Sequence, residues 1–72
     1  MSTNTEWILD GARVRGLYLE TFPVVGVVID SRVCYGGGVK YTVALDTPME
    51  VYGAMRETVN IFEPKVLEVL NG

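Results

Sequence analysis

The sequence predicts an all-β domain of about five short strands, and three observations support this prediction. Valine, isoleucine and tyrosine recur in short runs that are bounded by glycine, proline and aspartate, as strands and turns require. The clearest run, residues 39–46, alternates apolar and polar side chains with a period of two. With 72 residues, 49% of them hydrophobic, the chain is long enough for one domain and fills one small core without a metal or a disulfide.

The first strand is predicted in "ARVRGLY", residues 12–18, after a turn at Asp10-Gly11. One face of it carries Val14, Gly16 and Tyr18, and the other carries Arg13, Arg15 and Leu17. Before it, residues 1–9 are expected to form an N-terminal arm, with Trp7, Ile8 and Leu9 against the single domain at residues 10–72. After it, "LETFP", residues 19–23, breaks the alternation and is predicted as a loop.

The next two strands flank a glycine triplet. The run "VVGVVIDSRV", residues 24–33, predicts a long strand, in which Gly26 marks a bulge or a close approach of another backbone. In "VKYTVALD", residues 39–46, the side chains of Val39, Tyr41, Val43 and Leu45 point to one face. The glycines at 36–38 between these strands are predicted to form a hairpin turn, because glycine readily adopts the positive φ angles of tight turns.

The end of the chain predicts further short strands. A turn is expected at "DTP", residues 46–48, followed by a strand in "MEVYGAMR" and another in "TVNIF", with Val59 and Ile61 inward. Glu63-Pro64 ends the last of these. The final "KVLEVL", residues 65–70, is either one helical turn or a last short strand, and its β-branched residues favour the strand.

The glycine triplet does not predict a phosphate site. Phosphate-binding glycine loops lead into a helix whose first N–H groups face the anion, whereas these glycines lead into a period-two run. The glycine hairpin is nevertheless a loop that can adapt to a partner, so Tyr35 beside it is kept as a contact candidate.

Composition excludes several function classes. The chain has nine acidic and six basic residues, a net charge of −3 and no histidine, so it lacks the commonest general base and metal ligand. An acidic total disfavours nucleic acid as a partner, because such binding draws on cations that neutralise phosphates. The lone Cys34 forms no internal disulfide, and no run is long and apolar enough for a membrane span or a signal peptide. We therefore expect a cytoplasmic protein.

No combination of residues predicts catalysis. Asp30, Asp46 and Glu50 are not spaced as metal ligands, and acidic residues near hairpin ends usually form turns or keep the surface soluble. Cys34 and Ser31 have no histidine to activate them. We expect no enzyme, no cofactor and no metal.

The order of the runs resembles the small SH3-like β-barrels. The stretch "DGARVRG" followed by "VVGVVIDSR" is similar to the start of the KOW and Tudor-like barrels, and "VNIFEPKVLEVL" is similar to their ending, a strand, a short helical turn and a closing strand. A small accessory protein of photosystem I has a similar plan. The resemblance covers residues 10–70 and implies a five-stranded SH3-like barrel with a short helical turn before the last strand. It also implies docking to a larger molecule through loops and an open strand edge.

The sequence thus predicts a binding module, an accessory or adaptor protein of the bacterial or phage type that docks onto a larger protein. Two alternatives stay open. One is RNA binding through a basic strand face, which needs the cations between residues 13 and 56 to converge. The other is a structural subunit or a homo-oligomer. Exposed tyrosine, phenylalanine and arginine are typical of interfaces. The partner-binding candidates are Arg13, Arg15, Tyr18, Phe22, Arg32, Tyr35, Tyr52 and Arg56.

Overall fold

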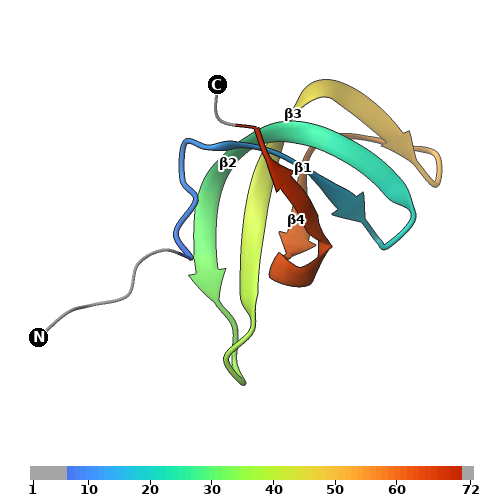
Figure 1. The fold of residues 1–72 in the computed structure, drawn as a ribbon. Helices are drawn as coiled ribbons and strands as arrows, with labels where there is room; N and C mark the ends of the chain where they lie inside the picture. The colour runs from blue at the N-terminus through green and yellow to red at the C-terminus, as the bar shows by residue number, and fades with distance from the viewer. Residues whose placement is uncertain (1–6, 71–72) are drawn as a thin grey trace, which may run out of the picture.

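A computed structural model describes residues 7–70 and contains one antiparallel sheet of five strands (Figure 1). The elements are β1 (Arg13–Tyr18), β2 (Phe22–Val33), β3 (Val39–Val51), β4 (Ala54–Phe62), the 3₁₀ turn η1 (Glu63–Lys65) and β5 (Val66–Val69). The strand order is β4-β3-β2-β1-β5, so every neighbouring pair except β1 and β5 is consecutive in the chain. The prediction of an all-β fold with five strands is confirmed.

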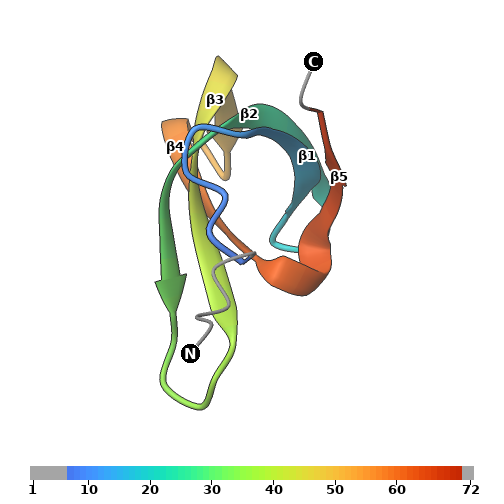
Figure 2. The same cartoon turned by 60° about the vertical axis from the view of Figure 1, so that its left-hand side comes forward.

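The sheet curls around its own inner face but stays open. Figure 2 shows β2 and β3 bending so that β1 and β5 come to lie across from β4. β1 contacts β4, and η1 connects the two sides at one end of the fold. Over residues 7–70, however, β4 and β5 remain the two edges of the sheet and do not pair with each other.

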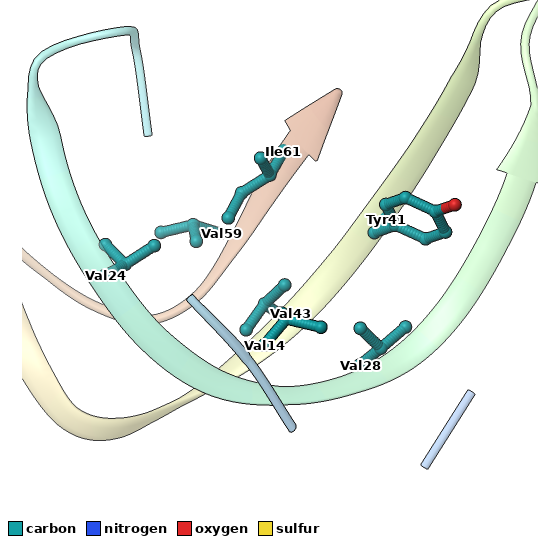
Figure 3. Packing of buried hydrophobic residues seen from close by; sticks show 7 residues of the cluster. All are labelled: Val14, Val24, Val28, Tyr41, Val43, Val59 and Ile61. Atoms are coloured by element: carbon teal, nitrogen blue, oxygen red, sulfur yellow. The ribbon is translucent and has the colours of Figure 1, made fainter. Parts of the chain in front are cut away.

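The core consists of alternate residues from β1 to β4. Val14, Val24, Val28, Tyr41, Val43, Val59 and Ile61 are buried and pack together on the inner face (Figure 3). The predicted alternation of β3 and the inward positions in β4 are thereby confirmed. The buried Tyr41 hydroxyl donates a hydrogen bond of 2.7 Å to the main-chain oxygen of Trp7, which satisfies its polar atom.

Gly26 marks a close backbone approach, as the sequence predicts. It is buried opposite Leu45, and a β-carbon built on it would lie 2.1 Å from the main-chain oxygen of Ala44. The bulge lies further along, between Val28 and Asp30. Only glycine lets β2 and β3 approach this closely, so residue 26 fixes how the central strands pack.

The connection between β1 and β2 is shorter than predicted. The expected loop at residues 19–23 is a turn at 19–21, in which the Thr21 N–H donates to the Tyr18 oxygen at 3.2 Å. Phe22 and Pro23 already belong to β2. Pro23 is tolerated because the β2–β3 pairing begins only at Gly26, so β2 has a neighbour on one side alone at this point.

The predicted turn at residues 46–48 is wrong. β3 continues through these residues, and its pairing with β4 is interrupted between Ala44 and Met49. Pro48 lies in this interruption, where its missing N–H removes no bond of the ladder. The true turn is Tyr52-Gly53, where both residues have positive φ (49° and 82°), as a two-residue hairpin requires.

The two ends of the described chain follow the prediction in part. Leu9 packs against the core and its N–H donates to the Ser31 hydroxyl at 3.0 Å, whereas Ile8 is 43% exposed. Residues 1–6 of the predicted arm lie outside the described residues. At the other end, the strand favoured for residues 65–70 is confirmed as β5, and the helical turn lies just before it, in η1.

Candidate functional site

Three of the predicted contact residues lie at one end of the sheet, although Tyr18 is half-buried and packs against the core. Tyr18 and Phe22 are the last register pair of β1 and β2, and Tyr52 lies in the turn between β3 and β4. The rings of Phe22 and Tyr52 meet edge to face, with centroids 5.8 Å apart and an interplanar angle of 85°. Tyr18, Phe22 and Tyr52 are called the aromatic end below.

Tyr52 is held in an unusual backbone conformation at this end. Its φ of 49° lies in the left-handed region, which bulky residues rarely occupy, and its side chain is 85% exposed. Such strain costs about 1–3 kcal/mol and persists where the surroundings enforce it. Here the two-residue hairpin enforces it, and an exposed aromatic ring stands at a position that asparagine would fill with less strain.

A groove of about 380 Å³ lies between the start of β2 and the bent part of β3. An ion pair between Arg13 and Asp46 contributes to its wall. The other residues that line it are mostly apolar, and they are Pro23, Val24, Val25, Leu45, Thr47 and Met49. Because Pro23 and Val24 directly follow Phe22, the groove and the aromatic end share the beginning of β2.

The predicted arginines are spread over three strands and do not form one cluster. Arg13 and Arg15 lie on β1 and pair with Asp46 and with Glu68, the latter at 3.4 Å. Arg32 lies near the far end of β2, where its Nε donates to Asp30 at 2.7 Å. Arg56 lies on the edge strand β4 and has no ion-pair partner among residues 7–70. Three of the four predicted arginines therefore have a carboxylate partner.

Tyr35 lies in the connection between β2 and β3 and does not belong to the aromatic end. The connection is a hairpin, with the Cys34 N–H donating to the Gly38 oxygen at 2.6 Å and the Gly37 N–H donating to the Cys34 oxygen at 2.9 Å. Gly36 and Gly37 have φ values of 96° and 94°, which confirms the predicted role of the glycine triplet. Figure 1 shows this hairpin projecting away from the rest of the sheet.

A second groove, of about 360 Å³, is absent from the sequence prediction. It is lined by Leu17, Leu19 and Glu20 from β1 and its turn, by Asn60, Ile61 and Phe62 from β4, and by Pro64 and Lys65. The Lys65 ammonium pairs with Glu20 at 2.7 Å, and this hydrogen bond lowers the pKa of the Glu20 carboxyl. No local pattern reveals this groove, because it forms only where distant strands meet.

The structure brings no catalytic constellation together in residues 7–70. Asp30 and Asp46 each pair with an arginine, and the Ser31 hydroxyl donates to Asp10 at 2.5 Å with no histidine in the chain. No group of three or more metal-ligating side chains occurs in this range. Burial, with a smaller effect of the Glu63 charge, raises the pKa of Tyr41, whose hydroxyl already donates inside the fold.

No protein-family model, curated protein or solved structure matches the chain. The part of the chain between Trp7 and Leu70 has no helix with the length and apolar character needed to cross a membrane.

Proposed function

We propose that the protein is a non-catalytic binding module that docks onto a larger protein through its aromatic end. The observation that carries this proposal is the edge-to-face pair of Phe22 and Tyr52, two aromatic rings from segments 30 residues apart in the chain, of which Tyr52 is 85% exposed. Tyrosine and phenylalanine are enriched in protein interfaces because they bury much area and lose little side-chain freedom. The role is that of an accessory or adaptor protein in the cytoplasm.

The proposed architecture behind this role is an SH3-like barrel. The five antiparallel strands, the 3₁₀ turn before the last strand and the contact between β1 and β4 agree with that plan. In this arrangement the turns at residues 19–21 and 52–53 lie near the same end and carry the aromatic residues on short connections. Short connections keep the rings in place, which lowers the entropic cost of binding.

RNA binding receives less support than protein docking. It requires arginines that are free to neutralise several phosphates. Arg13 and Arg15 already pair with carboxylates of the same chain, and Arg32, partly neutralised by Asp30, lies on another strand. The net charge of −3 opposes a polyanion as well.

Self-association through the edge strand β4 also receives little support. When two copies of one strand pair antiparallel about a two-fold axis, opposite residues share a face of the sheet. Even-numbered residues of one copy therefore lie opposite even-numbered residues of the other, and odd-numbered opposite odd-numbered. Arg56 then never faces Glu57 of the second copy, so the pairing gains no direct cross-strand ion pair from the two charges on this edge. Such charges on an edge instead discourage pairing.

The test is a comparison of partner capture by three forms of the protein. The immobilised wild type, Tyr52→Ala and Tyr35→Ala are incubated with lysate of the source cells, and captured proteins are quantified by mass spectrometry. Tyr35→Ala is the matched control, because it removes an exposed tyrosine from another connection. A specific partner that is lost with Tyr52→Ala and kept with Tyr35→Ala supports docking at the aromatic end. Equal capture by all three forms contradicts it.

A further inference from the structure

A row of two cations and one aromatic ring crosses three strands at the base of the β2–β3 hairpin. Arg32 is the register partner of Lys40, and Lys40 is the register partner of Phe62 on β4. Residues that are directly opposite in an antiparallel pair point to the same face, with β-carbons about 4.5–5.5 Å apart. Tyr41 and Ile61, which follow and precede members of the row, are buried, so the row lies on the outer face. Arg32, Lys40 and Phe62 are called the basic row.

The two cations of the row are only partly neutralised. Asp30 accepts from the Nε of Arg32, whose two terminal nitrogens make no hydrogen bond within residues 7–70. Lys40 has no ion-pair partner in the same range. Glu63, the first residue of η1, directly follows Phe62, and its charge acts on the hydroxyl of the buried Tyr41. The row therefore has several free N–H donors and a net positive charge.

The neighbouring row, Asp30, Thr42 and Asn60, holds the carboxylate that pairs with Arg32 and adds one more donor. The Thr42 hydroxyl donates to Oδ1 of Asn60 at 2.9 Å, and Asn60 is exposed. This bond orients the amide and leaves its two N–H groups as donors toward solvent. Phe62, with 54% of its side chain exposed, supplies an apolar contact beside these donors.

Two cations in register are expected to reduce the stability of the fold. Like charges directly opposite each other in a sheet repel and destabilise it. In a chain with nine acidic residues, a carboxylate opposite Arg32 would instead attract, yet lysine stands there. A cost to folding on an exposed face is expected where the residues serve binding.

We propose that the basic row binds carboxylates of an acidic segment of a partner protein, at a surface separate from the aromatic end. Two cations side by side, with an amide donor and an aromatic ring, suit one or two carboxylates with an adjacent apolar side chain. A nucleic acid needs more free cations than this face offers, because Arg13 and Arg15 are paired with acids on β1. The inference goes beyond the proposed docking at the aromatic end and does not depend on it.

The test is fluorescence anisotropy with a labelled oligoglutamate peptide, carried out with the full chain. The wild type is expected to bind the peptide more weakly as salt is added. Lys40→Ala and Arg32→Ala are each expected to weaken binding about two- to fivefold, the effect of one exposed ion pair. Arg56→Ala is the matched control, because it removes the same charge from an exposed residue without an ion pair in residues 7–70. It is expected to leave binding nearly unchanged.

Lys40→Glu separates binding from folding. It places a carboxylate opposite Arg32, so it is expected to raise the melting temperature slightly and to abolish peptide binding. The proposal is overturned if the peptide does not bind the wild type, or if Arg56→Ala weakens binding as much as Lys40→Ala does. A single-stranded oligonucleotide that binds through Lys40 where oligoglutamate does not would also overturn it, and would identify the row as a nucleic-acid contact.

Discussion

Gly26→Ala is expected to destabilise the fold strongly, because it pushes the two central strands apart. The new β-carbon would lie 2.1 Å from the main-chain oxygen of Ala44 and 2.8 Å from its carbonyl carbon, whereas ordinary contact begins at 3.4 Å. The obstacle is backbone, so no side-chain rotation relieves the clash. β2 and β3 must separate at the Gly26–Leu45 pair, close to the core residue Val43.

The size of the effect follows from general magnitudes. Overpacking a well-packed interior costs about 1–3 kcal/mol, and a clash with an opposing strand belongs at the upper end. A chain of this length is expected to have a total stability of about 4–10 kcal/mol. A loss of about 3 kcal/mol corresponds to a fall in melting temperature of about 12 °C or more.

The assay is thermal and urea unfolding followed by circular dichroism, with Gly38→Ala as the matched control. Gly38 has no atom within 4 Å of an added β-carbon and does not have a positive φ. Alanine there is expected to change stability by less than about 1 kcal/mol, in the stabilising direction. If Gly26→Ala and Gly38→Ala unfold at the same temperature, the close approach of β2 and β3 is refuted.

Three further predictions concern the turn after β1 and the buried tyrosine. Leu19→Asn is expected to raise the stability by a few tenths of a kcal/mol in urea titrations, because Leu19 has a φ of 53° and asparagine tolerates that conformation better; a decrease would contradict this. The hydrogen bond and charge of Lys65 lower the pKa of Glu20 from 4.5. The ionised Glu20 carboxylate therefore stabilises the fold fully above pH 4.5, and this stabilisation is lost as the pH falls through the lowered pKa. Glu20→Gln should therefore lower the melting temperature near neutral pH and have no effect at acid pH, and an equal effect at both would argue against this ion pair. Burial raises the pKa of Tyr41 above 10.0. The neutral Tyr41 hydroxyl therefore contributes fully to the stability of the fold below pH 10, and this contribution is lost as the pH rises through the raised pKa. Tyr41→Phe loses the bond to Trp7, about 1 kcal/mol at neutral pH, and should show a smaller alkaline loss than the wild type.

Local patterns in the sequence predict much of the fold. The alternation in β3 reflects one buried face, and the glycine triplet reflects the positive φ values of a hairpin, so both can be read from neighbouring residues. Gly26 also indicates a close backbone approach from local sequence alone, because a glycine inside a strand usually marks a bulge or a place where another backbone comes near. These features depend on a few consecutive residues.

The errors arise where tertiary pairing overrides a local signal. Pro48 and the preceding residues resemble a turn, but β3 continues through them. The strand accommodates Pro48 because the pairing with β4 is interrupted at that point. Leu19 and Glu20 form a tight turn without glycine or asparagine, so no sequence signal announces it. The candidate sites are harder still to predict, because the contact of Phe22 with Tyr52 and the row of Arg32, Lys40 and Phe62 depend on strand register.

The most direct test of the docking claim is photo-crosslinking inside the source cells from two positions. A benzophenone amino acid is placed at residue 52 in one form of the protein and at residue 35 in another, since both native tyrosines are exposed. We predict an adduct of the chain with a larger protein from position 52, and weaker or no formation of the same adduct from position 35. The same adduct in equal amount from both positions, or none from position 52, would contradict docking at the aromatic end.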